Sequence, residues 1–327
     1  MAGTRLKSVV LAAACAALVT ALPAAAQDFP SRTITVIHPF TAGSATDVAL
    51  RLICAKASEL SGQQIIVENR PGAGGAVGAA ALKRAKPDGY TLMQVSQGTL
   101  AVAPHLAANP PFDPIKDFQP ITQLWEAATF LIVPANSPIA SSAALATLAK
   151  QRRGGLSNAT QGVGSAAHVV GAMVAKSLGV PLTHIPYNGG AASKPDVLTG
   201  RVDMTFAFYG LFKAEIEERK VRVLAVASSA RIPVWPDIPT LQESGYPGVE
   251  YVEWFGLAGP AGMDPKVALA ISSLFARAVA DPGVAERLVA TNGFVVKHSA
   301  PDEFAKRIAA THAELGRVIK EMGIERK

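Results

Sequence analysis

The sequence contains few of the residues that build metal sites. Two of its 327 residues are cysteines, six are histidines and 6% are aromatic. No two histidines fall four residues apart on a predicted helix, and no Cys–His spacing resembles a zinc site. We therefore expect neither a metal nor a cofactor. The histidines are His38, His105, His168, His184, His298 and His312.

Cysteine is also too scarce for an intrachain disulfide. Cys15 lies in an apolar N-terminal run, which leaves Cys54 as the one thiol of the rest of the chain, and a single thiol cannot form a bridge. The segment around Cys54, VALRLICAKASEL, has apolar residues at helical spacing. This spacing predicts a buried core position for Cys54 rather than a reactive thiol.

Charge of one sign is not concentrated anywhere in the chain. Arg5 and Lys7 are two of the 31 basic residues, so without them 29 basic residues face 25 acidic ones, a net charge of +4. The short clusters KRAK and KQRR have no aromatic side chains between them, so nucleic-acid binding is not expected. A mildly basic protein favours anionic ligands weakly through its overall field.

The N-terminus has the pattern of a cleaved signal peptide. Arg5 and Lys7 precede an apolar run from Val9 to Leu22, and an Ala-x-Ala site follows. The alternative is a membrane anchor, but the run is shorter than the roughly 20 residues that a spanning helix needs. We predict that residues 1–26 are removed and that the protein is exported. No later stretch is long and apolar enough to span a membrane.

Beyond residue 26 the chain alternates between β-branched segments and amphipathic helical segments. Strands are predicted at 33–40, 63–68 and 90–96, with helices between them, which is typical of parallel βαβ units. The pattern restarts after residue 135, and extended segments near 120–135 and 225–257 cross between the two blocks. We predict an α/β, two-lobed, type II-like clamshell with a mostly parallel sheet flanked by helices in each lobe. Lobe 1 would be 27–123 plus 236–327, lobe 2 would be 124–235, and ligand would bind between them.

A glycine-rich stretch, RPGAGGAVGAA, follows the predicted strand at 63–68 and resembles a nucleotide-binding loop. Gly72, Gly74 and Gly78 give the spacing G-x-G-x-x-x-G, however, which is not the dinucleotide pattern. In the usual strand order 2-1-3 this turn lies one strand away from the cleft. We interpret it as a tight structural turn whose glycines let helix and sheet approach closely.

Catalysis has little support in the sequence. GVGSAAH places Ser165 three residues before His168, but Ala167 stands where a nucleophile elbow would have its last glycine. Ser165 can be a helix N-cap. It can also help a helix N-terminus to bind an anion, and we favour this second interpretation.

Three strand ends have compact polar turns that suit a small anion. PFTAGSATD ends the first strand, with a helix predicted to begin near Ser44–Asp47, and SQGT ends the third strand. GVGSAAH follows the strand LSNAT in the second block. Carboxyl ends of parallel strands are where open α/β sheets bind ligands. In FAFY, Phe206 and Phe208 alternate as core residues, whereas Tyr209 and Tyr187 are predicted to face the cleft.

Ten collinear pieces make the chain resemble the Bug family of extracytoplasmic solute receptors, the binding proteins of tripartite tricarboxylate transporters. They are PFTAGSATD, VENRPGAGGAVG, KPDGYTL, PFDPIKDFQPIT, GVGSAAH, HIPYNGG, LTGRVDMTF, VRVLAVASSAR, PDIPTLQESGYPG and WFGLAGPAG. The resemblance implies a periplasmic two-lobed protein that hands a small carboxylic acid to a membrane permease. It also implies that backbone N–H groups and bridging waters hold one ligand carboxylate. The residues at those places are Phe40, Thr41, Ala42, Gly43, Thr160, Gln161, Gly164, Ser165 and His168.

Three positions depart from the family pattern, and the proline of ASKPD falls later than is common. Ser44 replaces a second glycine, and Ala103 stands where a polar Asn is frequent. Ala207 stands where many members have Asp, which argues against an amino-acid ligand and leaves di- or tricarboxylates and aromatic acids. Lys194 is either a distal cation for a second carboxylate or a solvated helix residue, and we favour the latter.

We therefore predict a receptor and not an enzyme, a monomer that serves the permease subunits of a tripartite tricarboxylate transporter. Two alternatives remain, a periplasmic enzyme using Ser165 and His168, and a ligand sensor for a membrane signalling partner. The predicted ligand-binding residues are Phe40, Thr41, Ala42, Gly43, Ser44, Asp47, Ser96, Gln97, Thr99, Thr160, Gln161, Gly164, Ser165, His168, Tyr187, Ala207 and Tyr209.

Overall fold

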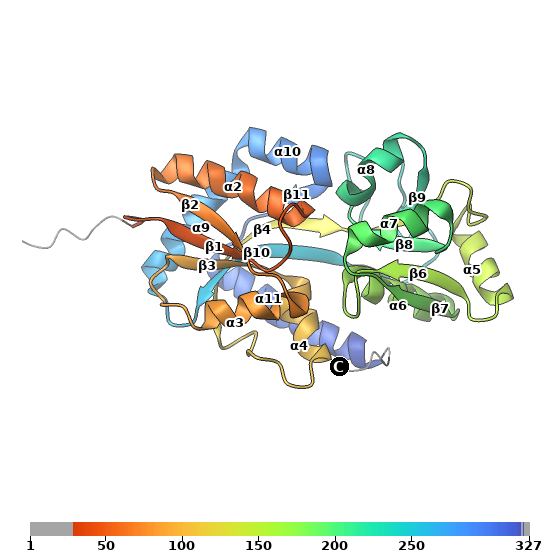
Figure 1. The fold of residues 1–327 in the computed structure, drawn as a ribbon, viewed down its shortest axis with the longest axis horizontal. Coiled ribbons are helices and arrows are strands. Elements are labelled where there is room, and N and C mark those ends of the chain that lie inside the picture. The colour runs from red at the N-terminus through yellow and green to blue at the C-terminus, as the bar shows by residue number, and fades with distance from the viewer. Residues whose placement is uncertain (1–28, 322, 324–327) are drawn as a thin grey trace, which may run out of the picture. The chain divides into compact units, whose positions relative to one another are not determined.

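The computed structural model describes residues 29–321 and 323, so the predicted signal peptide, residues 1–26, lies outside the described residues. The described residues from Arg32 onward belong to one compact unit, and the description below concerns this unit. It contains two β-sheets, each with helices packed on both faces (Figure 1).

The first sheet has the strand order β11-β4-β10-β3-β1-β2. β1 (Ile34–His38) runs parallel to β2 (Ile65–Asn69) and to β3 (Thr91–Ser96). This confirms the predicted local order 2-1-3. The other strands are β4 (Phe118–Ala128), β10 (Val252–Pro260) and β11 (Phe294–Val296), and each pairs antiparallel with its neighbours.

The second sheet has the order β7-β6-β8-β5-β9. β6 (Leu156–Thr160) is parallel to β7 (Leu182–Pro186) and β8 (Met204–Ala207), again in a 2-1-3 arrangement. β5 (Phe130–Pro134) pairs antiparallel with β8 and β9 (Val221–Val226). Both sheets are therefore mixed, not mostly parallel as predicted, because the strands that lead from one sheet to the other run against their neighbours.

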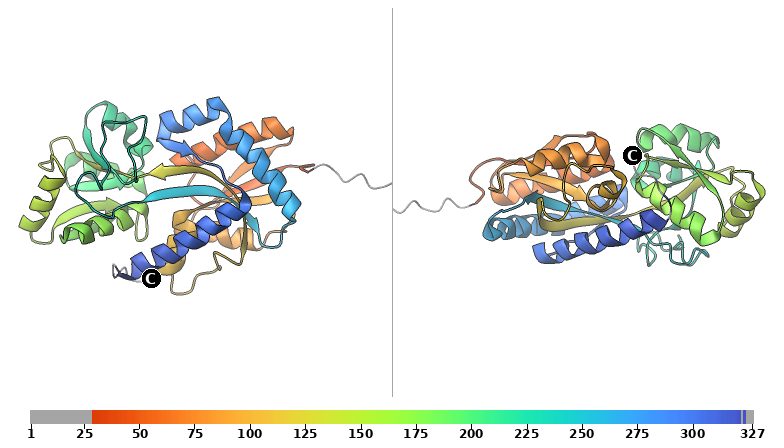
Figure 2. Two further views of the ribbon diagram at one scale, coloured as in Figure 1. Left: turned by 180° about the vertical axis from the view of Figure 1, so that it is seen from behind. Right: turned by 90° about the horizontal axis from the view of Figure 1, so that it is seen from below.

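The helices cover both faces of each sheet. In the first sheet α2, α9 and α10 lie on one face, and α3 and α11 lie on the other (Figure 2). The helices are α2 (Ala45–Ser61), α3 (Ala76–Lys83), α4 (Ala103–Leu106), α5 (Ser142–Gln151), α6 (Ala166–Leu178), α7 (Gly190–Thr199), α8 (Tyr209–Glu217), α9 (Pro265–Ala280), α10 (Pro282–Asn292) and α11 (Pro301–Glu321), with a 3-10 turn η1 (Ala73–Gly75) and a π-helical turn η2 (Gly98–Val102).

No single helix within residues 29–321 is long and apolar enough to cross a membrane. The pair α9 and α10 reaches the length and apolar composition of a span when taken together, but the two helices meet at a bend of 68°.

The chain passes between the sheets twice, near the places predicted from sequence. β4 continues through Thr129 into β5, and the return path joins β9 to β10. Backbone hydrogen bonds tie the two paths together, from Ala227 N–H to Thr129 O and from Tyr251 N–H to Ala227 O, both 2.8 Å. Residues 124–128, placed in lobe 2 by the sequence, are part of β4 in the first sheet. The lobe boundaries themselves stay a prediction.

The start, the end and the buried face of helix α2 each follow from its local sequence. Ser44 caps its N-terminus, and Gly62 ends it in the left-handed conformation, donating its N–H to Ser58 O. The buried stripe of the helix includes Leu50, Ile53 and Cys54. Burial raises the pKa of the Cys54 thiol well above its usual range, so the predicted core role of Cys54 is confirmed.

The glycine-rich stretch is a packing element. A Cβ at Gly75 would lie 2.7 Å from Thr99 Oγ1, and Gly75 has a φ of +95°. A Cβ at Gly78 would lie 3.3 Å from Ile37 Cγ2 in β1. The close approach of helix and sheet is as predicted. The stretch is nearer to the predicted ligand-binding end of β3 than the strand order implied, because η1 packs directly under η2.

We expect Gly75→Ala to destabilise the protein by more than Gly62→Ala. Both glycines have positive φ, which costs a non-glycine residue about 1–2 kcal/mol. Space is open around Gly62, whereas Thr99 and Pro39 crowd Gly75, and such overpacking adds about 1–3 kcal/mol. Urea denaturation of the two variants measures the difference, and equal losses of unfolding free energy would show that the close approach does not matter.

Candidate ligand-binding site

Two turns, one after the central parallel strand of each sheet, have almost the same backbone. Gly43 and Gly164 have φ of 77° and 79°. The next residues, Ser44 and Ser165, have φ/ψ of −67°/159° and −65°/157°. Each serine caps a helix, because its Oγ accepts the N–H of the third residue after it, at 3.3 Å in α2 and 3.4 Å in α6.

Each turn also uses the side chain four residues beyond its glycine. Gly43 donates its N–H to Asp47 Oδ2 at 2.9 Å, and Gly164 donates its N–H to His168 Nδ1 at 3.1 Å. These two amides are therefore occupied. Other amides around the turns have no hydrogen-bond partner among residues 29–321. They include the N–H groups of Thr41, Ala42, Ala45, Val163 and Ala166.

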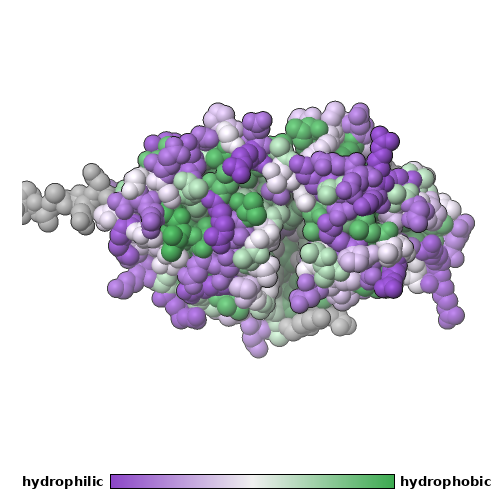
Figure 3. Space-filling model, turned by 45° about the horizontal axis from the view of Figure 1, so that its top comes forward, coloured by the Kyte–Doolittle hydropathy of each residue, from purple (hydrophilic) through white to green (hydrophobic). Residues whose placement is uncertain are grey.

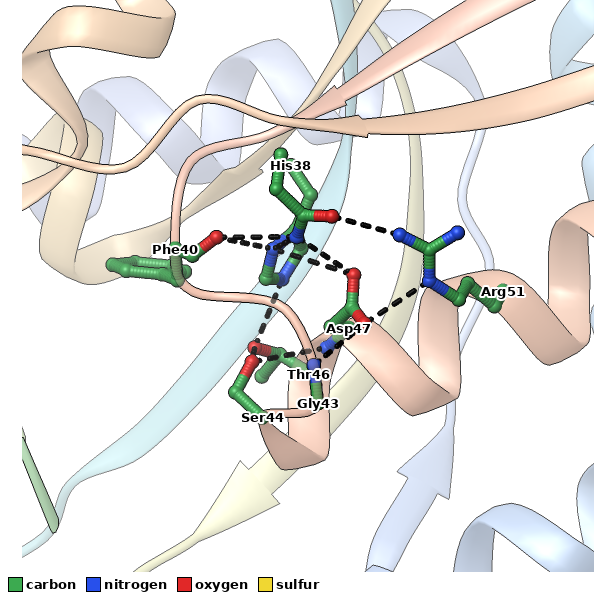
Figure 4. A network of polar contacts seen from close by, with 8 residues as sticks. His38, Phe40, Gly43, Ser44, Thr46, Asp47 and Arg51 are labelled. Atoms are coloured by element: carbon green, nitrogen blue, oxygen red, sulfur yellow. Dashed lines mark hydrogen bonds and ion pairs between the residues drawn. The ribbon is translucent and has the colours of Figure 1, made fainter. Parts of the chain in front are cut away.

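The Gly43 turn rests on a buried polar network (Figure 4). The Asp47 carboxylate is 3% exposed and accepts hydrogen bonds from Gly43, from Arg51 Nε at 3.0 Å and from Asn69 Nδ2 at 2.8 Å. Burial raises the pKa of Asp47, but these three hydrogen bonds outweigh it and leave the pKa below its usual value. Beside it, burial lowers the pKa of His38. The buried Asp47 carboxylate thus holds the Gly43 turn in place through its hydrogen bond with the Gly43 N–H.

The Gly164 turn has imidazole rings in place of the carboxylate. The His168 and His184 ring centroids lie 4.0 Å apart, and His184 Nε2 is 2.7 Å from Thr160 Oγ1. Thr160 Oγ1 also accepts the Gly162 N–H at 3.2 Å. Sequence reasoning missed His184. Its strand β7 neighbours β6 in the 2-1-3 order, which was the available signal that His184 lies beside Thr160.

The end of β3 is buried and internally bonded. Ser96, Gln97 and Thr99 are at most 5% exposed, and Thr99 N–H donates to Ser96 Oγ at 3.2 Å. Gly98 N–H donates to Glu253 Oε1 at 3.2 Å. Burial raises the pKa of Glu253 to about 7. Sequence reasoning missed Glu253, since it lies within a strand pattern 155 residues away along the chain.

Three other predicted residues lie at or just after the ends of second-sheet strands. Tyr187 donates its hydroxyl to Asp196 Oδ2 at 2.8 Å, and burial together with Asp196 raises the pKa of Tyr187 to about 12. Ala207 ends β8 and is buried. Tyr209 is 7% exposed and stacks on Trp235, with ring centroids 3.9 Å apart.

The neighbours of these residues help to define their roles. Tyr209 and Trp235 line a recess of about 650 Å³ between α8 and α10. Phe206 is fully buried, as predicted, and Phe208 packs 5.8 Å from Phe294 between ring centroids. Lys194 pairs with Glu215, with Nζ and Oε1 2.6 Å apart.

Close contacts connect several of the predicted turns. Pro39, just before the Gly43 turn, lies against Gly75, which lies against Thr99. Leu106, the last residue of α4, lies against the Gly164 turn, because a Cβ on Gly164 would be 2.2 Å from Leu106 Cδ1. The surface shows a groove between the part that holds α2 and the part that holds α7 (Figure 3). No group of three or more His, Cys, Asp or Glu side chains suited to a metal occurs among the described residues.

We expect Asp47→Asn to lower the free energy of unfolding by about 1–3 kcal/mol at pH 7, because a buried bonding partner of Arg51 loses its charge. A carboxyl with a lowered folded-state pKa stabilises the protein above its unfolded pKa and loses that contribution as pH falls through the folded-state pKa. The gap to the wild type therefore closes below about pH 4.

Urea denaturation at pH 7 and pH 3 measures this gap. Glu59→Gln is the matched control, because Glu59 is an exposed residue of the same helix, paired with Lys56. Its effect should stay within about 0.5 kcal/mol at both pH values. An Asp47→Asn gap that persists unchanged at pH 3 would contradict the assignment.

Comparison with known proteins places the chain among solute receptors. Residues 49–324 match the model of the tripartite tricarboxylate transporter family receptor, TctC. A Cupriavidus necator protein from the gbd 5′ region is 36% identical over 281 residues, covering 85% of both chains. BugT of Bordetella pertussis is 30% identical over 308 residues, covering 94% of both chains.

Three solved structures share the fold at similar identity. The periplasmic binding protein BugD has a TM-score of 0.81 at 30% identity, covering 91% of this chain and all of BugD. Rpa4515 of R. palustris with adipate has a TM-score of 0.85 at 29% identity, covering 92% of this chain and all of Rpa4515. MatC of Rhodopseudomonas palustris with malate has a TM-score of 0.79 at 30% identity, covering 89% of this chain and all of MatC.

These findings confirm the family resemblance that the ten motifs indicated, the binding-protein fold and the absence of an enzymatic role in the family. The chain belongs to the tripartite tricarboxylate transporter family of periplasmic solute-binding receptors.

Proposed function

We propose that this receptor captures a small organic carboxylate, a di- or tricarboxylate or an aromatic acid, between the Gly43–Ser44 turn and the Gly164–Ser165 turn. It then delivers the acid to the permease subunits of a tripartite tricarboxylate-type transporter. The observation that carries the proposal is the pair of matched turns, each with unpaired amides at a helix N-terminus. Such amides, aligned with the helix dipole, favour an anion.

The charges around the turns set how the anion is held. The Asp47 carboxylate lies behind the first turn, and Arg51 and two further donors compensate it. The second turn has no carboxylate in the equivalent position, because His168 occupies it. The ligand carboxylate therefore meets less repulsion at the Gly164 turn. The solved structures of Rpa4515 with adipate and of MatC with malate support the ligand class.

The residues beyond the turns narrow the class of acid. Ala207 offers no counter-charge for an amine, which disfavours an amino-acid ligand. Lys194 is engaged by Glu215, so we keep it out of the binding site. Ser96 and Thr99 support the end of β3 from within, and their part in binding is to hold that end in place. Asp47 is proposed to act from behind the Gly43 turn, and Tyr209 from the recess between α8 and α10. The other predicted residues are proposed to line the cleft directly or through water.

We also propose where the protein works and how it meets the permease, by analogy with the family. Residues 1–26 act as a signal peptide that sends the chain to the periplasm, where it works as a monomer. Lobe 1 (27–123 plus 236–327) and lobe 2 (124–235) close on the ligand, and the closed form docks on the permease.

A ligand screen tests the proposed class. The protein is unfolded and refolded to strip bound ligand, then heated with adipate, malate, citrate or benzoate. At 100 times its Kd an acid that binds should stabilise the protein by about 2.7 kcal/mol, and the corresponding amides should not. An absence of stabilisation by every acid, with a correctly refolded protein, would overturn the proposal.

Substitution of Ser165 by Ala should weaken acid binding by about fivefold to tenfold, because the capping hydroxyl orders the Gly164 turn. Ser141→Ala is the matched control. Ser141 caps α5 by accepting the Ala144 N–H at 3.3 Å, so both variants lose about 1 kcal/mol of stability. Titration calorimetry should show a weaker Kd in Ser165→Ala alone. Equal Kd values in both variants would exclude the Gly164 turn from the binding site.

A further inference from the structure

A carboxylate is buried on the strand that returns from the second sheet to the first. Glu253 is the second residue of β10 and is 7% exposed. Its Oε1 accepts the Gly98 N–H at 3.2 Å, and the Ser96 side chain is its second hydrogen-bond partner. Burying a carboxylate costs free energy unless it is well bonded. The position of Glu253 therefore calls for an explanation beyond simple packing.

The residue that Glu253 holds begins an unusual segment. Gly98–Val102 is a π-helical turn that leads directly into α4, Ala103–Leu106. Turns of this kind are rare and often lie at functional sites. The segment ends at Leu106, against the Gly164 turn. It therefore reaches from the crossing strand to the proposed ligand site.

Other contacts hold the middle of the segment. Thr99 Oγ1 lies 3.5 Å from Gly74 O, and His312 Nδ1 lies 3.1 Å from Leu100 O. His105 Nε2 lies 2.8 Å from His312 O, and the two imidazole rings stack. Glu253 is thus the anchor at the first residue, while η1 and α11 support the rest.

We propose that Glu253 is a positioning residue that fixes segment Gly98–Leu106 and thereby sets how closely this segment meets the Gly164 turn when the acid binds. The inference rests on the proposed function, because it assigns the segment to the ligand site. It adds a residue outside the turns that touches no ligand.

The protonation state of Glu253 makes the proposal testable. Burial raises the pKa of Glu253 to about 7, against the hydrogen bonds from Gly98 and Ser96. Just before the start of β10, burial and the charge of Glu253 together raise the pKa of Tyr251. From β3 and η2 the groups that face it are the Ser96 hydroxyl and the Gly98 amide. Among the described residues, burial and these two hydrogen bonds account for the shift of the Glu253 pKa. The hydrogen bonds from Gly98 and Ser96 lower the pKa of Glu253, so they are stronger to the ionised carboxylate than to the neutral one. In this proposal Glu253 stays buried when the segment shifts, so the burial cost does not change and the segment is held more firmly above pH 7.

The test compares wild type with Glu253→Gln in acid binding from pH 5.5 to pH 8.5. The amide keeps the shape and one acceptor oxygen but cannot ionise. At pH 5.5, where Glu253 is protonated, the two proteins should have the same Kd. At pH 8.5 the wild type should bind about fivefold more tightly. Glu250→Gln, an exposed residue close by in sequence, should follow the wild type at every pH. Kd curves that stay parallel or coincide would overturn the proposal.

Hydrogen exchange supplies a readout that needs no ligand. At pH 8 the peptide covering Gly98–Leu106 should exchange faster in Glu253→Gln than in the wild type, while a peptide from α9 should be unchanged. If no acid binds but this peptide loosens, the proposed function fails and the positioning role stands. If acids bind and exchange is unaltered, the positioning role fails alone. Circular dichroism of both variants confirms that they are folded.

Discussion

The antiparallel pairing of β4 with β10 is the constraint on which both sheets depend. The two strands are paired from Phe118 with Pro260 to Ala128 with Val252. At one end both strands are inside the first sheet, and at the other they lead into the second. Any change in their register would shift the ends of both sheets together, including the residues that end β3 and the turn after β6.

The Gly43 and Gly164 turns have the same backbone conformation, but different side chains bond the glycine amide in each. In each, a glycine with positive φ precedes a serine cap, and the glycine amide is bonded by the side chain four residues on. Asp47 brings a negative charge that Arg51 offsets, whereas His168 accepts through Nδ1 and so bears its ring proton on Nε2 in the neutral form. The two turns therefore have the same backbone conformation but different charges behind them. An anion meets a carboxylate behind the Gly43 turn and an imidazole behind the Gly164 turn.

Several features of the fold and of the site could be predicted from local sequence patterns. The caps at Ser44 and Ser165, the helix end at Gly62, the burial of Cys54 and the 2-1-3 strand order all follow from patterns spanning a few residues or one βαβ unit. The Glu253–Gly98 hydrogen bond does not, because it joins residues 155 positions apart and exists only once β10 lies beside β3. The mixed character of the sheets was missed for the same reason, since strand direction depends on crossings that propensity does not encode.

The edge strands of the two sheets affect how readily copies of the protein associate at high concentration. The edge strands are β2 and β11 in the first sheet and β7 and β9 in the second. β2 and β7 are five residues long, β9 is six and β11 is three, and β7 ends in Pro186. The exposed end of β2 has an ion pair between Glu68 and Arg70. Short strands, charges and proline at an edge discourage another chain from adding to the sheet. Copies of this protein at high concentration therefore have few places where one can extend the sheet of another, which protects the folded chain from ordered aggregation.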